Sequence, residues 1–324
     1  MGWGRVLMAK AVGTEDEVIE LIERLGVTGA AKKLGVTLNR LHTRRRRIEH
    51  RRGIVIKPPG NKSPTKDLTE HPGRLAIEIE NGNILIGSDS HYYPGIISTA
   101  HRAFVKFNKE LKPKYVIKNG DELDFPKISR HAPIGWENQP SVVAEIETAQ
   151  DRLEEIRQVN KNAKYFWPLG NHDARFETRL ATIASEYANV KGIHLKDHFP
   201  GWAPCWSVWV NDEVVIKHRW HNGIHAVYNN TLKSGKSIVT GHLHSLKVTP
   251  WTDYNGTRWG VDCGSMADPW GPQFENYMED NSRNWISGFV VLTFHKGRML
   301  WPEHVHVIDE KAGLVEFRGQ VYEV

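Results

Sequence analysis

Apolar residues in the first part of the chain recur every three to four positions, which predicts short amphipathic helices. The first expected helix begins at Thr14, where Glu17 completes a capping box, and it ends at Gly26. A second lies between Gly26 and Gly35, and a third begins after Thr37. Three short helices with a tight turn before the last one are typical of a helix-turn-helix.

From Leu75 onward, short apolar runs alternate with helical stretches, which predicts a layered α/β domain. The expected helices lie at 98–111, 141–159 and 177–188. The expected strands lie at 84–86, 115–117, 165–167, 206–210, 214–217, 237–240, 246–251, 257–261, 289–294 and 299–307. Asn211-Asp212 is expected to form the turn of a hairpin.

Polar side chains of the metal-binding type follow five of these apolar runs. In chain order they are Asp-x-His at 89–91, Gly-Asp-x-x-Asp at 120–124, Gly-Asn-His-Asp at 170–173, a single His at 218, and Gly-His-x-His at 241–244. Each fragment alone is common, because Asn-His-Asp is more often an ordinary polar turn and most isolated histidines are structural. Ligands collect at the carboxyl ends of strands in open α/β sheets, so five such fragments in series predict one shared site.

With these fragments in this order, the chain resembles the calcineurin-like metallophosphoesterases, closely from Ile84 to His244 and loosely over the rest of the large domain. The resemblance implies a four-layer α-β-β-α sandwich and a hydrolase that holds two divalent metal ions. It assigns seven ligands: Asp89, His91 and His244 to the first ion, Asn171, His218 and His242 to the second, and Asp121 to both. Mixed imidazole and carboxylate ligands suit manganese, iron or zinc; manganese is the expected ion, with iron, zinc or nickel as alternatives.

The resemblance also implies a mechanism in which a metal-bridging hydroxide attacks the phosphorus atom. His172 would protonate the leaving oxygen or steady the phosphoryl group, and Asp173 would orient it in a His–carboxylate pair. Arg175 is a candidate contact to the substrate phosphate, with a surface salt bridge as the alternative. Asp124 is expected to hydrogen-bond within its own loop.

Two positions depart from common patterns of the superfamily. His218 is followed by Arg219, where glycine is usual, so His221 stays open as an alternative ligand. Phe125-Pro126 follows the Gly-Asp-x-x-Asp motif, where the protein serine/threonine phosphatases carry Arg-Gly, and this disfavours that branch. The segments 120–130 and 170–175 look like the phosphoesterases often found in phage and prophage genomes.

The positive charge of the chain is concentrated at its N-terminus. Residues 1–70 hold 15 Lys and Arg against 8 Asp and Glu, whereas the remaining residues hold 28 against 30. Such a basic segment is typical of a phosphate binder, and Gly29–Leu41 resembles the turn and recognition helix of Fis-type helix-turn-helix proteins. A basic arm that shields the large domain or binds a protein is the alternative. The candidate nucleic-acid contacts are Arg40, Arg44, Arg45, Arg47 and Arg51.

We therefore expect a helix-turn-helix domain at 1–56, a Pro-rich linker at 57–74 and the metallophosphoesterase domain at 75–324. No apolar run approaches the ~20 residues needed to cross a bilayer, the N-terminus lacks signal-peptide features, and two cysteines cannot form a disulfide framework. These features favour the cytoplasm, that of a bacterial host if a phage encodes the protein. They leave the oligomeric state open.

The favoured hypothesis is a metal-dependent phosphodiesterase or nuclease that acts on DNA and is delivered by its N-terminal domain. One alternative is a phosphomonoesterase or nucleotide phosphatase whose N-terminal domain is regulatory. Another is a DNA-binding regulator with an idle metal domain, although a complete ligand set argues against idleness. Tyr92, Tyr93, Trp220, Trp270 and Trp285 are candidates for stacking on bases, with core packing as the alternative.

Overall fold

The computed structural model describes residues 13–56 and 71–324, which fall into two units, Met1–His71 and Pro72–Val324. The first twelve residues and most of the predicted linker, residues 57–70, lie outside the described residues. None of the helices in the described ranges is both long and apolar enough to span a bilayer.

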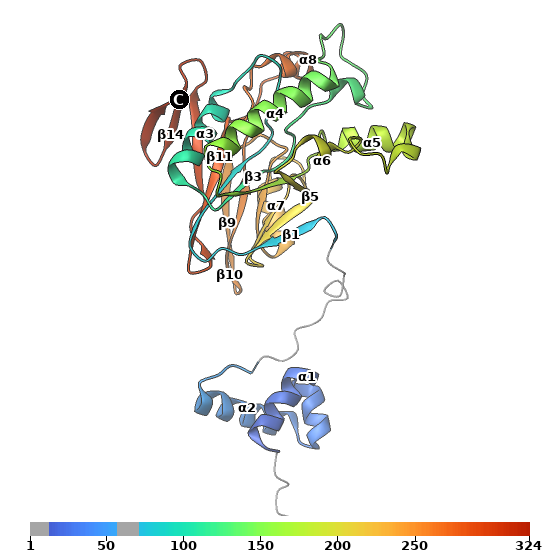
Figure 1. Cartoon of the computed structure of the whole chain (residues 1–324). Helices are drawn as coiled ribbons and strands as arrows, with labels where there is room; N and C mark the ends of the chain where they lie inside the picture. Colours follow the sequence, from blue (N-terminus) through green and yellow to red (C-terminus); the bar gives the residue numbers. More distant parts are fainter. Residues whose placement is uncertain (1–12, 57–70) are drawn as a thin grey trace, which may run out of the picture. The chain divides into compact units, whose positions relative to one another are not determined.

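Two β-sheets form the centre of the second unit (Figure 1). The six-stranded sheet has the order β1 (Arg74–Ile77), β6 (Ser207–Val210), β7 (Val214–Ile216), β8 (Ser237–Thr240), β10 (Gly256–Asp262) and β9 (Lys247–Asp253). The nine-stranded sheet has the order β15 (Gln320–Glu323), β14 (Leu314–Phe317), β13 (Glu303–Asp309), β11 (Gly288–His295), β2 (Gly82–Gly87), β3 (Tyr115–Lys118), β4 (Lys164–Pro168) and β5 (Ala203–Cys205), with β12 (Arg298–Met299) paired to β11.

Alternation along the strands explains why the two sheets stack. Successive side chains of a strand point to opposite faces, so Ile84 and Ile86 of β2 enter a cluster that also contains Val208 of β6 and Val239 of β8. This cluster fills the space between the sheets. Leu85, between the two isoleucines, enters a second cluster on the outer face of the nine-stranded sheet.

Helices cover the outer face of each sheet. The second cluster includes apolar residues of α3 (Thr99–Leu111) and α4 (Val142–Gln158). On the other side, α7 (Ala226–Ser234) packs on β8, β9 and β10, and a side chain at Gly260 of β10 would collide with Val227 and Thr231 of this helix. The predicted four-layer α-β-β-α arrangement is therefore confirmed.

Shorter helices lie in the connections between these strands and helices. They are η2 (Pro126–Ile128), α5 (Ala174–Ile183), η3 (Ser185–Tyr187), α6 (Leu195–His198), η4 (Pro272–Phe274) and α8 (Glu275–Met278).

The first unit contains α1 (Glu15–Leu34) and α2 (Leu38–Arg52) around a small apolar core of its own. Thr14 and Glu17 form the expected capping box, and Gly26 interrupts α1 with a non-helical backbone at φ 72°. The chain therefore forms three helical segments, with Gly35 and Thr37 bounding the turn before the last one. Whether this unit binds DNA stays a prediction.

Candidate metal centre

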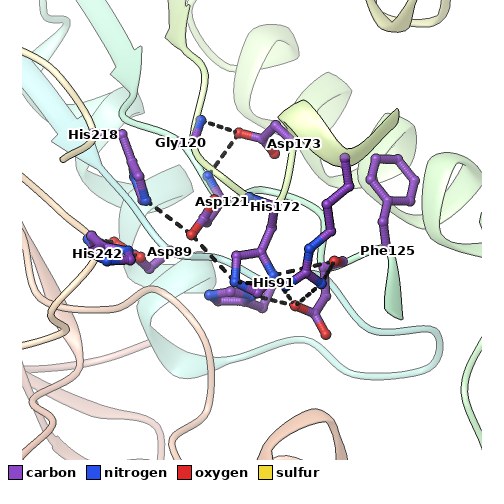
Figure 2. Close-up of polar contacts among 12 residues, drawn as sticks. Asp89, His91, Gly120, Asp121, Phe125, His172, Asp173, His218 and His242 are labelled. Carbon is purple, nitrogen blue, oxygen red and sulfur yellow. Dashed lines mark hydrogen bonds and ion pairs between the residues drawn. The ribbon is translucent and has the colours of Figure 1, made fainter. Parts of the chain in front are cut away.

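The five polar fragments lie on loops that directly follow β2, β3, β4, β7 and β8. Parallel pairing of β2 with β3, of β3 with β4 and of β7 with β8 places these loops at one edge of the sheets. Asp89, Asp121 and Asn171 come from the nine-stranded sheet, whereas His218 and His242 come from the six-stranded sheet. The candidate site therefore spans the junction of the two layers (Figure 2).

One cluster consists of Asp89, His91 and His244, each of which offers a ligand atom within 4.8 Å of the others. The carboxylate of Asp89 lies 3.1 Å from His244 Nε2 and also accepts a hydrogen bond from the backbone N–H of His242. Nε2 of His91 and Nδ1 of His244 are buried and have no hydrogen-bond partner among the described residues. Such buried polar atoms are rare unless a ligand satisfies them.

A second cluster consists of Asp121, His218 and His242. His218 Nε2 lies 3.0 Å from Asp121 Oδ2, and its other ring nitrogen lies 2.7 Å from the carbonyl oxygen of Asn119, which fixes the ring orientation. The Oδ1 atom of Asn171 is buried and has no hydrogen-bond partner in the described part of the chain. His221 lies outside both clusters and stacks on Trp220 instead.

Five of the predicted ligands have left-handed backbone conformations. Their φ values are 55° at Asp89, 39° at His91, 54° at Asp121, 74° at His242 and 56° at His244. A non-glycine residue in this region is uncommon; each costs on the order of 1–3 kcal/mol and persists only where the surrounding structure imposes it. Strained residues of this kind concentrate at functional sites, and here they coincide with the polar clusters.

Two glycines permit the backbones of neighbouring loops to approach these ligands. A Cβ atom on Gly170 would lie 2.0 Å from Asp121 Oδ1, and one on Gly241 would lie 2.5 Å from Asp89 Oδ2. Neither position has room for a side chain. The glycine that precedes Asn171 and the glycine that precedes His242 are thus required by the packing of the loops around the two carboxylates.

Charge pairing within the clusters shifts the acidity of their members. Burial by itself would raise the pKa of Asp89, but the neighbouring His244 and His218 outweigh it and lower that pKa to about 2. Burial would lower the pKa of His218, but Asp121 and Asp89 raise it to about 10. A cation bound here would replace the proton on His218. Metal binding should therefore release protons and weaken as the pH falls.

His172 lies beside the clusters and is paired with a carboxylate other than the predicted one. Its Nδ1 atom contacts the carboxylate of Asp124, which also lies 3.4 Å from His91 Nδ1. Burial opposes ionisation of Asp124, but its hydrogen bonds with His172 and His91 hold its pKa far below the ordinary value. Asp124 therefore contacts histidines of two other loops, which corrects the expectation that it hydrogen-bonds within its own loop.

Asp173 does not orient His172, which corrects the predicted role. It begins α5 with a helical backbone, so its carboxylate points back into the loop after β3. Its oxygens accept hydrogen bonds from the backbone N–H groups of Asp121, Glu122 and Gly170 and from the indole of Trp167. Asp173 therefore holds the backbone of the ligand-bearing loop in place (Figure 2).

Arg175 lies next to His172, and both residues line a cleft. Its guanidinium donates to the carbonyl oxygen of Asp124 over 2.7 Å, and Nη2 lies 3.5 Å from His172 Nε2. The cleft has a volume of about 820 Å³, within the range of small-molecule sites, and residues of both clusters line it. Arg175 thus lines the cleft together with residues of both clusters.

The aromatic residues proposed for base stacking differ in position. Tyr93 and Trp285 line the cleft, and Trp285 packs against His244 with ring centroids 4.5 Å apart. Tyr92 also reaches the cleft but is almost completely buried. Trp220 and Trp270 are exposed and do not line the cleft, so the structure does not bring them to the site.

The donor set of the two clusters suits divalent metal ions. Imidazole and carboxylate ligands suit manganese, iron or zinc, whereas calcium requires six to eight oxygen ligands. An ion at 100 times its Kd adds about 2.7 kcal/mol of stability, so we expect EDTA to lower the Tm of Mn²⁺-loaded protein by about 5–10 °C. Differential scanning fluorimetry with Ca²⁺ as the control ion tests this; an unchanged Tm would contradict the metal site.

The predicted nucleic-acid contacts in the first unit do not all face solvent. Arg45 pairs with Glu49 at 2.9 Å and donates to the carbonyl oxygen of Ile56, so it stabilises the fold of the unit. Arg51 is exposed and pairs with Glu15. Arg40 is exposed, and Arg44 is half-buried. An exposed groove on α2 is lined by Thr43, Arg46, Arg47, His50 and Arg51.

Comparison with known proteins gives distant relatives. No family model matches the chain. Over 254 residues it is 24% identical to the Gene 54 protein of Mycobacterium phage L5 and 26% identical to the Gene 54 protein of Mycobacterium phage D29. Each alignment covers 69% of this chain and 92% of the relative. These relatives are phage proteins, as the pattern of the site loops predicted.

Among solved structures, the chain is similar to Vps29 of Entamoeba histolytica complexed with zinc, with a TM-score of 0.38 and 12% identity over 74% of this chain and 96% of Vps29. It is also similar to YfcE, a phosphoesterase from E. coli, with a TM-score of 0.32 and 16% identity over 68% of this chain and 97% of YfcE. For Vps29 of Chaetomium thermophilum the TM-score is 0.37, with 10% identity over 75% and 98% of the two chains.

Proposed function

We propose that this protein is a metal-dependent phosphoester hydrolase that holds two divalent ions. The observation that carries the proposal is the pair of adjacent buried His/Asp clusters at the carboxyl edge of the two sheets. Their ligands sit on strained loops, and several of their donor atoms are buried without partners among the described residues. A structural role alone would explain neither feature.

The residues beside the clusters suit transfer of a phosphoryl group. Two bound divalent ions would supply Lewis acidity toward the phosphoryl oxygens and would lower the pKa of a water molecule. His172, paired with Asp124 through Nδ1, has its Nε2 atom 3.5 Å from Nη2 of Arg175. Protonated His172 would deliver a proton from Nε2 to the leaving oxygen. The Arg175 guanidinium would balance the negative charge of the phosphate.

We further propose that the substrate is a phosphodiester in DNA and that the first unit binds the duplex. The support is the groove on α2, in which Thr43, Arg46, Arg47 and His50 recur at helical spacing on one exposed face. Arginines on such a face can neutralise backbone phosphates. Tyr93 and Trp285 in the cleft offer aromatic surfaces for a base next to the reacting phosphate.

A substrate panel tests the proposal. With Mn²⁺, purified protein should hydrolyse bis-p-nitrophenyl phosphate and labelled DNA, and it should act weakly on p-nitrophenyl phosphate. Activity on the monoester alone would overturn the DNA proposal in favour of a phosphomonoesterase. Salt-dependent duplex binding without turnover under any metal would favour a DNA-binding regulator.

The roles of Asp124 and Asp173 can be separated by matched substitutions. Asp124→Asn removes the charge that stabilises protonated His172, so we expect kcat for the diester to fall about a hundredfold or more with little change in Tm. Asp173→Asn replaces an acceptor of several backbone hydrogen bonds, so we expect a lower Tm as its first effect. Steady-state kinetics and thermal melts of both variants measure this. The reverse pattern would contradict the assignment of Asp124 as the partner of His172.

A further inference from the structure

A fully buried ion pair lies next to the ligand-bearing loops of the candidate metal centre. Lys118 ends β3, and Glu122 follows the proposed bridging ligand Asp121. Lys118 Nζ lies 3.0 Å from Glu122 Oε2, and both side chains have an exposed fraction of 0%. Neither residue lines the cleft, so neither contacts a substrate bound there.

The same ammonium group also reaches the loop after β2. Lys118 Nζ donates a hydrogen bond of 2.6 Å to the hydroxyl of Ser90, which lies between the ligands Asp89 and His91. The side chain of Lys118 thus connects two loops that are about thirty residues apart in the sequence. One loop carries two ligands of the first cluster, and the other carries Asp121 of the second cluster.

Stability does not explain this arrangement. The ammonium and carboxyl groups are surrounded by apolar and weakly polar groups: the Phe104 ring lies 5.2 Å from Lys118 Nζ, and Met266 Sδ lies 2.9 Å from it. Glu122 Oε1 is buried and has no hydrogen-bond partner among the described residues. Replacing a buried ion pair by apolar residues of similar size is often neutral or stabilising. Apolar side chains of similar size would therefore fill this space at a lower cost in desolvation free energy.

The backbone on both sides of the pair is strained. Asp89 and His91, which flank Ser90, have left-handed φ values, and so does Asp121, which precedes Glu122. Residues in such conformations persist only where neighbouring contacts impose them. Lys118 supplies a contact of this kind to each loop at the residue adjacent to a ligand.

We propose that Lys118 and Glu122 are positioning residues, which hold the two ligand-bearing loops at the spacing that a pair of ions requires. This inference rests on the proposed function, because it needs the two clusters to bind metal. It predicts that the ion pair contributes to metal affinity more than to the stability of the fold. Groups behind metal ligands commonly have this effect, and losing one typically lowers metal affinity about 10–100-fold.

The test compares Mn²⁺ binding by isothermal titration calorimetry with the Tm of the metal-free protein. The double variant Lys118→Met/Glu122→Met removes both polar groups and keeps the volume, so we expect a Tm near that of the wild type and Mn²⁺ binding about 10–100-fold weaker. Ser90→Ala keeps the ion pair and removes only the link to the first loop, so we expect about tenfold weaker binding. Lys236→Met breaks an exposed ion pair with Asp212 and should change neither quantity.

The outcomes separate this inference from the function on which it rests. If the wild type binds no Mn²⁺, the proposed metal centre fails before the variants are compared. If the wild type binds Mn²⁺ and either folded variant binds it equally well, the positioning role is overturned. Should the double variant not fold, Ser90→Ala decides the question alone, because it leaves no charge unpaired.

Discussion

Asp121→Asn is expected to lower the turnover of bis-p-nitrophenyl phosphate with Mn²⁺ by about a thousandfold. The Asp121 carboxylate lies 3.0 Å from His218 and accepts a hydrogen bond from the backbone N–H of His172, so it belongs to the centre of the site. The asparagine side chain is nearly isosteric but neutral, so it holds a shared cation weakly. Metal ions contribute several kcal/mol to such reactions, which corresponds to about three orders of magnitude in rate.

The matched control for this prediction is Asp212→Asn, because Asp212 lies in a hairpin turn and its side chain is 84% exposed. We expect this variant to retain the activity and Tm of the wild type. Retention of more than a tenth of the turnover by Asp121→Asn at saturating Mn²⁺ would show that Asp121 is not a shared ligand.

Deleting residues 1–71 is expected to lower the cleavage of long duplex DNA about a hundredfold at low salt, because electrostatic contacts supply most non-specific DNA affinity. Hydrolysis of bis-p-nitrophenyl phosphate should stay within about twofold, since the second unit contains the whole candidate site and both of its own apolar clusters. Gel-based cleavage of a labelled duplex, measured beside the small diester, tests both statements.

A finer version of this experiment keeps the full chain. Arg46→Ala/Arg47→Ala removes two charges from the groove on α2 and should reduce the slope of log K against log salt by roughly 1.8. Lys32→Ala/Lys33→Ala removes the same charge from exposed positions outside the groove and should have the smaller effect. Equal cleavage of duplex DNA by the full and truncated chains would argue for a regulatory first unit.

The layered fold could be predicted because its signals are local. The run Ile84-Leu85-Ile86 became β2, and Asn211 and Asp212 formed the expected hairpin turn, with φ values of 51° and 52°. The predicted strand at 299–307 was wrong as one element, since the structure divides it into β12 and β13 around Pro302. Proline lacks the N–H group that a continuous ladder requires.

The helix α7 and the strand β1 have no clear signal in the local pattern of apolar and polar residues. The sequence of α7 is only weakly amphipathic, so it does not show which face of the helix is buried. Contact with β8, β9 and β10 determines that face. The strand β1 pairs with β6, more than 130 residues further along the chain. Such long-range pairing depends on the assembled sheet, and the sequence around Arg74–Ile77 does not reveal it.

Contacts within the candidate site also depend on the assembled fold, so the sequence predicted only some of them. The order of polar fragments at strand ends predicted one shared site, but not which carboxylate faces His172. Asp173 is its neighbour in sequence, whereas the structure turns Asp173 toward the backbone of Asp121 and presents Asp124 instead. Likewise, charge density predicted a basic first unit, but only the packing shows that Arg45 pairs with Glu49 within the fold. The pairing of Lys118 with Glu122 could not be predicted, because the residues of β3 before Lys118 form an apolar run that shows only a buried strand.

The candidate centre takes Asp89, Asp121 and Asn171 from one sheet and His218, His242 and His244 from the other. Ions bound there would cross-link the two layers much as a disulfide joins distant segments. The layers cannot separate during global unfolding without releasing the ions. Loaded protein should therefore persist in its folded form for longer than its equilibrium stability alone would indicate, because ion release adds to the barrier for unfolding.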